Sequence, residues 1–257
     1  MGLLNRILER KRAEVAELKQ LRLPQPPARR ALELTRMPGG GPLHLITEIK
    51  RRSPSAGVLS TRLSVAERAA SYAAAGASML SVLCDREFFD GSFQHLHDAR
   101  AACTLPVLCK DFVIDEQQLV VARAFGADAV LLIVRCLSPD RFQRLFDEAR
   151  QLELVPFVEV ATLEEARVAL DNGADLIGVN ARDLDTLVID REEAARVLGS
   201  LPDGVTKVHL SGVTSAARVR EVWGSQAHAA LIGEVLMRQD DPSRLLSEFV
   251  AAARNSP

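Results

Sequence analysis

Four ionisable side chains of this chain stand where they could move protons. Glu48 and Lys50 are two residues apart at the end of an apolar run, so an extended strand places them on the same face. Lys110 ends a second apolar run, and Glu159 lies near the end of a third. Lysines and carboxylates that burial and neighbouring charges perturb are suited to general acid–base catalysis. For Glu48 and Lys50, a purely structural ion pair is the alternative.

Two further sets of residues indicate a phosphorylated, partly aromatic ligand. Ser211-Gly212 and Gly233-Glu234 follow two late apolar runs, where small residues let backbone N–H groups approach an anion, and Ser55 adds a hydroxyl. Simple turns are the alternative for these glycines. Phenylalanines and leucines near the ends of other runs suit an aromatic ring, although core packing also explains the leucines. These apolar candidates are Phe89, Phe112, Leu83, Leu108, Leu131 and Leu184.

The elements that carry these residues alternate in type along the chain. Short β-type runs are separated by helical stretches, which predicts a parallel sheet with right-handed crossovers. Gly76, Gly126 and Gly173 each precede such a run, at intervals of two β–α units, and suit left-handed helix ends. Eight runs predict an α/β fold, a (β/α)8 TIM barrel, whose active site lies at the carboxyl ends of the strands. The predicted runs are 43–50, 79–84, 106–110, 129–134, 155–160, 176–180, 207–211 and 229–233.

The segment before the barrel has a different pattern. An amphipathic helix is predicted over 3–21, a second short helix over 27–34 and a linker over 37–42. We therefore expect residues 1–42 to form a helical extension and linker, and 43–257 the catalytic barrel, as a single domain overall.

Composition excludes several classes of protein. The chain has 257 residues and a formal net charge of −2, which gives no basic surplus for nucleic acid. We find no apolar run long enough for a membrane span and no secretory leader. The four cysteines form no C-x-x-C pair, and nucleotide and metal-site motifs are missing. We therefore expect a cytoplasmic protein with no cofactor, no metal, no nucleic-acid partner and no membrane contact.

Taken together, the motifs resemble those of indole-3-glycerol phosphate synthase. The most specific matches are EIKRRSPSAG at 48–57 and LCKDF at 108–112, supported by NARDL at 180–184 and GEVLMR at 233–238. Shorter matches fall at 81–83, 88–92, 126–128, 158–160 and 211–212, in the family's order from about residue 43 to 242.

The resemblance implies a reaction and the residues that perform it. The substrate would be 1-(2-carboxyphenylamino)-1-deoxyribulose 5-phosphate, which closes its ring and loses carbon dioxide and water to give indole-3-glycerol phosphate, in tryptophan biosynthesis. Lys110 would be the general acid and Glu159 the general base, with Lys50 on a substrate carboxylate or hydroxyl and Glu48 orienting the lysines. Asn180 and Arg182 would hold the substrate, and the phosphate would lie at Ser55, Ser211, Gly212, Gly233 and neighbouring amides. The enzyme would work as a monomer, with other tryptophan-pathway enzymes as candidate partners.

One position departs from the family's pattern. Leu210 stands where the family commonly has a glutamate. Strand alternation places it on the opposite face from His209, and the resemblance implies that this face points towards the mouth. We expect an active but slower enzyme. The remaining alternatives are an isomerase of a phosphoribosylated aromatic amine and a binding protein that has lost turnover.

Overall fold

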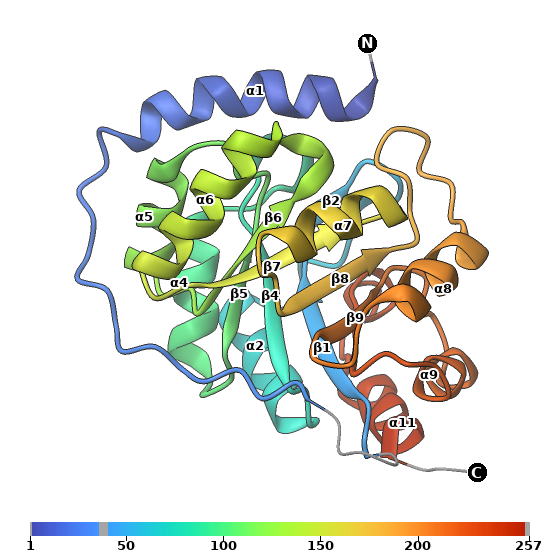
Figure 1. The fold of residues 1–257 in the computed structure, drawn as a ribbon. Coiled ribbons are helices and arrows are strands. Elements are labelled where there is room, and N and C mark those ends of the chain that lie inside the picture. Colours follow the sequence, from blue (N-terminus) through green and yellow to red (C-terminus); the bar gives the residue numbers. More distant parts are fainter. Residues whose placement is uncertain (1, 36–40, 255–257) are drawn as a thin grey trace.

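The computed structural model describes residues 2–35 and 41–254, and its central feature is a closed ring of parallel strands (Figure 1). Each predicted run matches one strand to within one residue at either end, and the strand order around the ring is β1-β10-β9-β8-β7-β6-β5-β4. The (β/α)8 barrel is therefore confirmed. The strands are β1 (His44–Ile49), β4 (Met79–Leu83), β5 (Val107–Lys110), β6 (Ala129–Ile133), β7 (Val155–Val160), β8 (Leu176–Asn180), β9 (Thr206–Leu210) and β10 (Ala229–Ile232).

Helices surround the ring and fill the connections between strands. They are α2 (Val65–Ala74), α3 (Arg86–Phe89), α4 (Phe93–Ala102), α5 (Glu116–Ala124), α6 (Pro139–Gln151), α7 (Leu163–Asp171), α8 (Arg191–Ser200), α9 (Ala216–Trp223), α10 (Glu234–Met237) and α11 (Ser243–Arg254), with a 3-10 turn, η1 (Val134–Cys136). A short hairpin of β2 (Arg52–Ser53) and β3 (Gly57–Val58) lies in the connection from β1 to α2.

Local sequence explains where these helices begin and end. Ser64 begins α2 with a reciprocal capping box to Glu67, because each residue's side chain bonds the other's backbone N–H. The glycines predicted at helix ends have left-handed backbones, with φ of +96°, +96° and +76° at Gly76, Gly126 and Gly173. At Gly126 a β-carbon would also come within 2.3 Å of Arg100 Cδ, so only glycine fits there.

Strand alternation divides the core into two parts. Side chains such as Ile46, Met79 and Phe157 fill the barrel interior, whereas neighbours such as Leu45 pack outwards against the helices. On β9, Leu210 belongs to the interior cluster and His209 does not. The interior below the mouth is therefore filled with side chains, as is usual for this architecture.

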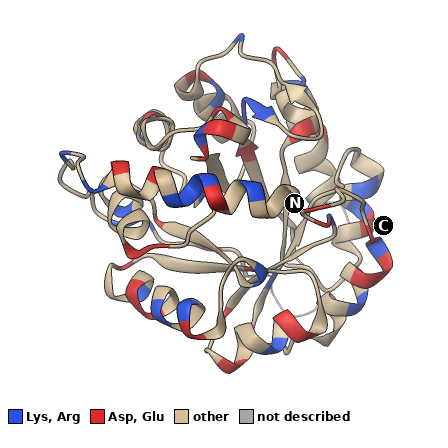
Figure 2. Cartoon of the chain, turned by 90° about the horizontal axis from the view of Figure 1, so that it is seen from above, with Lys and Arg blue, Asp and Glu red and all other residues tan. Residues whose placement is uncertain are grey.

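The N-terminal segment lies on two faces of the barrel. Helix α1 (Leu3–Leu18) crosses above the strands (Figure 1) and lies over the mouth when the molecule is viewed from above (Figure 2). The chain then runs down the side to the opposite face, where Arg30 N–H donates to Asp128 Oδ1 at 2.7 Å and the Arg30 guanidinium donates to the carbonyls of Leu105 and Arg100.

The second predicted helix, over 27–34, is wrong: this stretch has no helical structure. Its backbone and side chains bond the barrel rather than one another, and the preceding prolines limit helical geometry. Residues 36–40, most of the predicted linker, lie outside the described part of the chain.

Candidate active site

A cavity of about 420 Å³ opens at the carboxyl ends of the barrel strands, beneath α1. Its volume suits a small ligand. All the residues predicted for the site line this cavity except Leu108, which is fully buried in the barrel interior. The predicted residues in its wall are Glu48, Lys50, Ser55, Leu83, Phe89, Lys110, Phe112, Leu131, Glu159, Asn180, Arg182, Leu184, Ser211, Gly212, Gly233 and Glu234.

Two ion pairs form the charged centre of the cavity. Lys110 Nζ from β5 lies 3.4 Å from Glu159 Oε2 on β7, and Lys50 Nζ lies 2.8 Å from Glu48 Oε1 on β1. The two carboxylates are nearly inaccessible, with side chains 3% and 7% exposed, whereas the lysines keep 18% and 15% of their surface. The ammonium groups are thus more open to the cavity than the acids that hold them.

An amide fixes the orientation of Glu159. Asn180 Nδ2 donates to Glu159 Oε1 at 2.9 Å, so the two oxygens of Glu159 contact different groups, the amide and Lys110. The Asn180 carbonyl oxygen in turn accepts from the Ser211 hydroxyl at 2.8 Å and from the backbone N–H of Arg182 at 3.0 Å. These bonds link β7, β8 and β9 across the mouth.

The ion pairs decide the protonation states of the central groups. Burial is the largest influence on Lys110 and opposes its charge, but Glu159 and Glu48 together outweigh it and raise the pKa of Lys110 above the ordinary lysine value. Burial likewise opposes the charge on Glu48, yet Lys50 and Lys110 lower the pKa of Glu48 below its ordinary value. At neutral pH the cavity therefore holds a protonated Lys110 beside an ionised Glu48.

Small residues form one arc of the wall. Ser211 and Gly212 both have left-handed backbones, with φ of +73° and +77°, so the chain turns sharply after β9, and a turn can present backbone N–H groups to an anion. At Gly233 a β-carbon would lie 2.6 Å from Glu48 Oε1, so glycine leaves room for the carboxylate. In strand order this arc covers β9, β10 and β1, with Ser55 in the adjacent hairpin turn.

Apolar residues form the opposite arc, over β4, β5 and β6. The rings of Phe89 and Phe112 have centroids 6.1 Å apart and planes tilted by 35°, and Leu131 and Ile133 of β6 lie beyond them. Helix α1 adds Leu3 and Ile7 above. The charged side chains come from the ends of β1 and β5, within these two arcs, and from β7 beyond them, and they face the cavity that the two arcs enclose.

Several wall residues were missed by the sequence reasoning. Leu3 and Ile7 are apolar residues one helical turn apart on α1. Their spacing predicts an apolar helix face, but it does not predict that the helix covers the mouth. Arg191, at the start of α8, lines the cavity and, like Arg182, forms no ion pair within residues 2–35 and 41–254. Two guanidinium groups are thus open to an anionic ligand.

Leu210 lies where strand alternation predicts. Its side chain lines the cavity, is 2% exposed, and lies close to Gly178 on the neighbouring strand β8. A β-carbon at Gly178 would come within 2.7 Å of Leu210 Cδ1. Leu210 therefore fills interior space and adds no hydrogen-bonding group to the mouth.

The described residues offer neither a metal site nor a membrane-spanning helix. Within the described ranges, no group of three or more His, Cys, Asp or Glu side chains could hold a metal ion. No helix in those ranges has the length and apolar character needed to cross a bilayer.

Comparison with known proteins gives consistent matches over nearly the whole chain. The family model "Indole-3-glycerol phosphate synthase" matches residues 4–249. A protein of that name from Exiguobacterium sp. is 40% identical over 256 residues, covering 100% of this chain and 99% of its own length. "Indole-3-glycerol phosphate synthase 2" of Streptomyces coelicolor is 45% identical, covering 91% of this chain and 90% of its own.

Solved structures with similar folds have much lower sequence identity. A 3-hexulose-6-phosphate synthase superimposes with a TM-score of 0.66 at 16% identity, covering 82% of this chain and 99% of that one. A thiamine phosphate pyrophosphorylase from Pyrococcus furiosus gives a TM-score of 0.62 at 20% identity, covering 82% and 95%. These likenesses bear on the fold alone.

Proposed function

The chain belongs to the indole-3-glycerol phosphate synthase family, and from that premise we propose how its cavity carries out the family's reaction. The reaction belongs to tryptophan biosynthesis and is a decarboxylating ring closure. The substrate, 1-(2-carboxyphenylamino)-1-deoxyribulose 5-phosphate, forms one carbon–carbon bond and loses carbon dioxide and water. The product is indole-3-glycerol phosphate.

The substrate spans the mouth from one arc to the other. Its carboxyphenyl ring packs against Phe89 and Phe112, where burial of apolar surface favours an aromatic group. Its phosphate binds at Ser211, Gly212 and Gly233, the arc where backbone N–H groups can approach an anion. This orientation brings the ketone between Lys110 and Glu159, and Arg182 and Arg191 offset the substrate's negative charge.

Lys110 supplies the proton for ring closure. The ring carbon that bears the carboxylate attacks the ketone carbon, and the ketone oxygen takes a proton from Lys110 as the new bond forms. Loss of carbon dioxide then returns the electron pair to the aromatic ring. The raised pKa of Lys110 keeps the proton available at neutral pH, and the arriving substrate, by disturbing the contact with Glu159, makes it easier to release.

Glu159 removes the last proton. The new hydroxyl leaves as water after Lys110 has been reprotonated and has donated again, while the neighbouring carbon of the new ring loses its proton to Glu159. Asn180 holds one Glu159 oxygen at 2.9 Å and so directs the other into the cavity. Lys50 binds the substrate carboxylate until it departs, and Glu48, through its 2.8 Å contact with Lys50, keeps that ammonium group at the rim.

The observation that carries this assignment is the contact of Lys110 with Glu159 between the two arcs. We test it by incubating the protein with the substrate and following indole fluorescence together with released carbon dioxide. We expect one carbon dioxide for each indole formed. Tight substrate binding with no indole would instead identify a binding protein in which Leu210 has replaced a needed acid, and an isomerised product without carbon dioxide would identify an isomerase.

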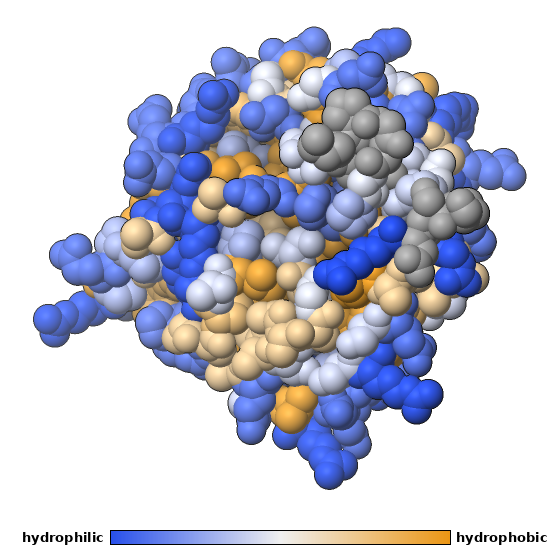
Figure 3. All heavy atoms as spheres, turned by 90° about the horizontal axis from the view of Figure 1, so that it is seen from below, coloured by the Kyte–Doolittle hydropathy of each residue, from blue (hydrophilic) through white to orange (hydrophobic). Residues whose placement is uncertain are grey.

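We also propose that the protein works as a monomer in the cytoplasm, alone or beside other enzymes of the tryptophan pathway. In support, only four large hydrophobic side chains are exposed among the described residues: Leu21, Val58, Leu163 and Val188. Hydrophilic side chains also make up most of the outline of the face opposite α1 (Figure 3). The cysteines are unpaired, as expected in a reducing compartment.

A further inference from the structure

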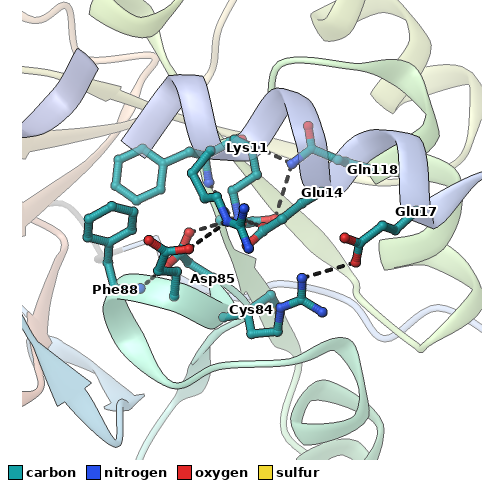
Figure 4. A network of polar contacts seen from close by, with 12 residues as sticks. Lys11, Glu14, Glu17, Cys84, Asp85, Phe88 and Gln118 are labelled. Atoms are coloured by element: carbon teal, nitrogen blue, oxygen red, sulfur yellow. Dashed lines mark hydrogen bonds and ion pairs between the residues drawn. The ribbon is translucent and has the colours of Figure 1, made fainter. Parts of the chain in front are cut away.

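A lysine of α1 is buried against three carboxylates at the edge of the mouth (Figure 4). Lys11 Nζ lies 2.8 Å from Asp85 Oδ2, 2.8 Å from Asp111 Oδ1 and 2.7 Å from Glu14 Oε2. The side chains of Lys11, Asp85 and Asp111 are each 2% exposed. Such a cluster requires its members to stay where they are, since any displacement would leave a buried charge without a partner.

The two aspartates also hold the loops that carry the aromatic pair. Asp85 Oδ1 accepts from the backbone N–H of Phe88 at 2.8 Å and so begins α3, which ends in Phe89. Asp111 Oδ1 accepts from the backbone N–H of Phe112 at 2.9 Å. One oxygen of each carboxylate therefore fixes the backbone beside a ring of the proposed aromatic pocket.

A glutamine completes the fixation of the second loop. Gln118 of α5 donates to Asp111 Oδ2 at 3.1 Å and to the carbonyl of Phe112 at 3.0 Å. Asp111 directly follows Lys110 in the chain, so the group that binds Lys11 is joined covalently to the proposed acid. Movement of Asp111 by a fraction of a bond length would move both Lys110 and Phe112.

Helix α1 is also tied to the other side of the mouth. The backbone N–H of Leu4 donates to Asp185 Oδ1 at 3.0 Å, in the loop that carries Arg182 and Leu184. The helix therefore joins three loops of the barrel, and Lys11 is its contact to the two that carry the aromatic rings.

From these contacts we propose that Lys11 is a positioning residue for ring closure, which sets Phe89, Phe112 and Lys110 at one mutual geometry through Asp85 and Asp111. The proposal rests on the roles given above to Lys110 and to the aromatic pair. Stability alone is a poor explanation for the cluster, because apolar side chains of similar volume usually stabilise a buried site at least as well as ion pairs do. The ion pairs of the cluster hold the two loops in one geometry, which apolar packing would not do.

The first experiment compares Lys11→Met with Lys19→Met, which removes an exposed lysine just after the same helix. Both are assayed well below their melting temperatures, with rates divided by the folded fraction from circular dichroism. We expect Lys11→Met to raise KM and lower kcat, for a loss in kcat/KM of about 10- to 100-fold, the effect of a small misplacement of reacting groups. Lys19→Met should match the wild type. A lower melting temperature with unchanged kcat and KM would overturn the proposal.

A second set of variants decides the matter if Lys11→Met does not fold. Asp85→Asn and Asp111→Asn keep the shapes of the side chains and leave Lys11 one aspartate. We expect each to raise KM, and Asp111→Asn also to lower kcat, because it adjoins Lys110. Where Lys11→Met does fold, it can be combined with Asp111→Asn. The loss in kcat/KM of this double variant should be smaller than the product of the losses of the two single variants, because both residues act through one contact. Independent effects, or wild-type kinetics in both aspartate variants, would overturn the proposal.

Binding of 2-aminobenzoate separates this proposal from the proposed function. This small aromatic acid is the ring portion of the substrate, and its fluorescence reports binding without turnover. We expect Lys11→Met to bind it about 10-fold more weakly than the wild type does, whether or not indole forms. If the wild type makes no indole, the proposed function is wrong, but the 2-aminobenzoate affinities of the wild type and Lys11→Met still test the positioning role of Lys11. Equal affinities would overturn the positioning role.

Discussion

Replacing Lys110 with methionine should abolish most of the activity and also weaken the fold. Methionine keeps the length of the side chain and removes only its charge and its proton. General acid–base catalysis contributes about 10²- to 10⁴-fold, so kcat should fall by at least about 10²-fold. This loss tests the proposed acid directly, since Lys110 is the one cation that forms an ion pair with Glu159 within the described part of the chain.

The effect on stability follows from the geometry of the pair. At 3.4 Å and an effective dielectric constant of about 20, the attraction between Lys110 and Glu159 is about 5 kcal/mol before desolvation is subtracted. Removing Lys110 leaves the carboxyl group of Glu159 3% exposed and bonded to the Asn180 amide, without its ion-pair partner. We therefore expect the free energy of unfolding to fall by about 2–4 kcal/mol, which is near the range for breaking buried pairs.

A matched double variant separates the two effects. Lys110→Met combined with Glu159→Gln removes both charges and leaves an amide that can still accept from Asn180. Its free energy of unfolding should return to within about 1 kcal/mol of the wild type, because neither charge is left unpaired. Its kcat should stay at or below that of Lys110→Met, because acid and base are both missing.

The assay is steady-state indole formation with urea unfolding on the wild type, Lys110→Met and the double variant. Near wild-type kcat in Lys110→Met would refute Lys110 as the acid. A double variant that regained activity together with stability would show that the single variant had failed only through its fold, and the reasoning from geometry to chemistry would be wrong.

Three further predictions follow from the structure. Burial and the nearby Arg218 lower the pKa of His209 to about 4, so the unfolded state binds more protons than the folded state between pH 6.5 and 4. The free energy of unfolding should therefore fall by about 3 kcal/mol as the pH drops through that window. Urea titrations at each pH should show that His209→Leu removes this loss. Leu210→Glu should raise kcat several-fold by giving a lysine of the cavity a second carboxylate, and should lower the melting temperature because it buries a charge; an unchanged or lower kcat would show that position 210 has no catalytic part. Inorganic phosphate should compete with substrate at Ser211 and Gly212, raising KM while kcat stays constant, and inhibition that lowers kcat alone would contradict that site.

Local signals in the sequence were enough to predict the barrel and most of its rim. Alternating runs and the glycines at 76, 126 and 173 predict the eight strands because strand patterns and left-handed helix ends depend on nearby residues. Lys110 and Glu159 could be placed together for the same reason, since the fold brings all carboxyl strand ends to one face.

Features that depend on contacts between distant segments could not be predicted in this way. The position of α1 over the mouth depends on Lys11 meeting Asp85 and Asp111, which the spacing within the helix does not reveal. The stretch over 27–34 avoids a helix because Arg30 bonds Asp128 across the bottom of the barrel.

The distance of each strand residue from the barrel mouth could also not be predicted from the sequence. Leu108 shares a strand face with Lys110, as alternation predicts, but lies two residues further from the mouth. Two residues of a strand span about 7 Å, which is enough to take Leu108 below the cavity. The division of the chain into an extension and linker over 1–42 and a barrel over 43–257, within a single domain, stays a prediction.

The most direct test of the account is a crystal structure of the protein with indole-3-glycerol phosphate bound. We predict that the indole ring packs against Phe89 and Phe112, that the phosphate contacts the backbone at Ser211, Gly212 and Gly233, and that Lys110 and Glu159 lie on either side of the newly closed ring. A product bound in the reverse orientation, with its phosphate among the phenylalanines or outside the barrel mouth, would contradict the account.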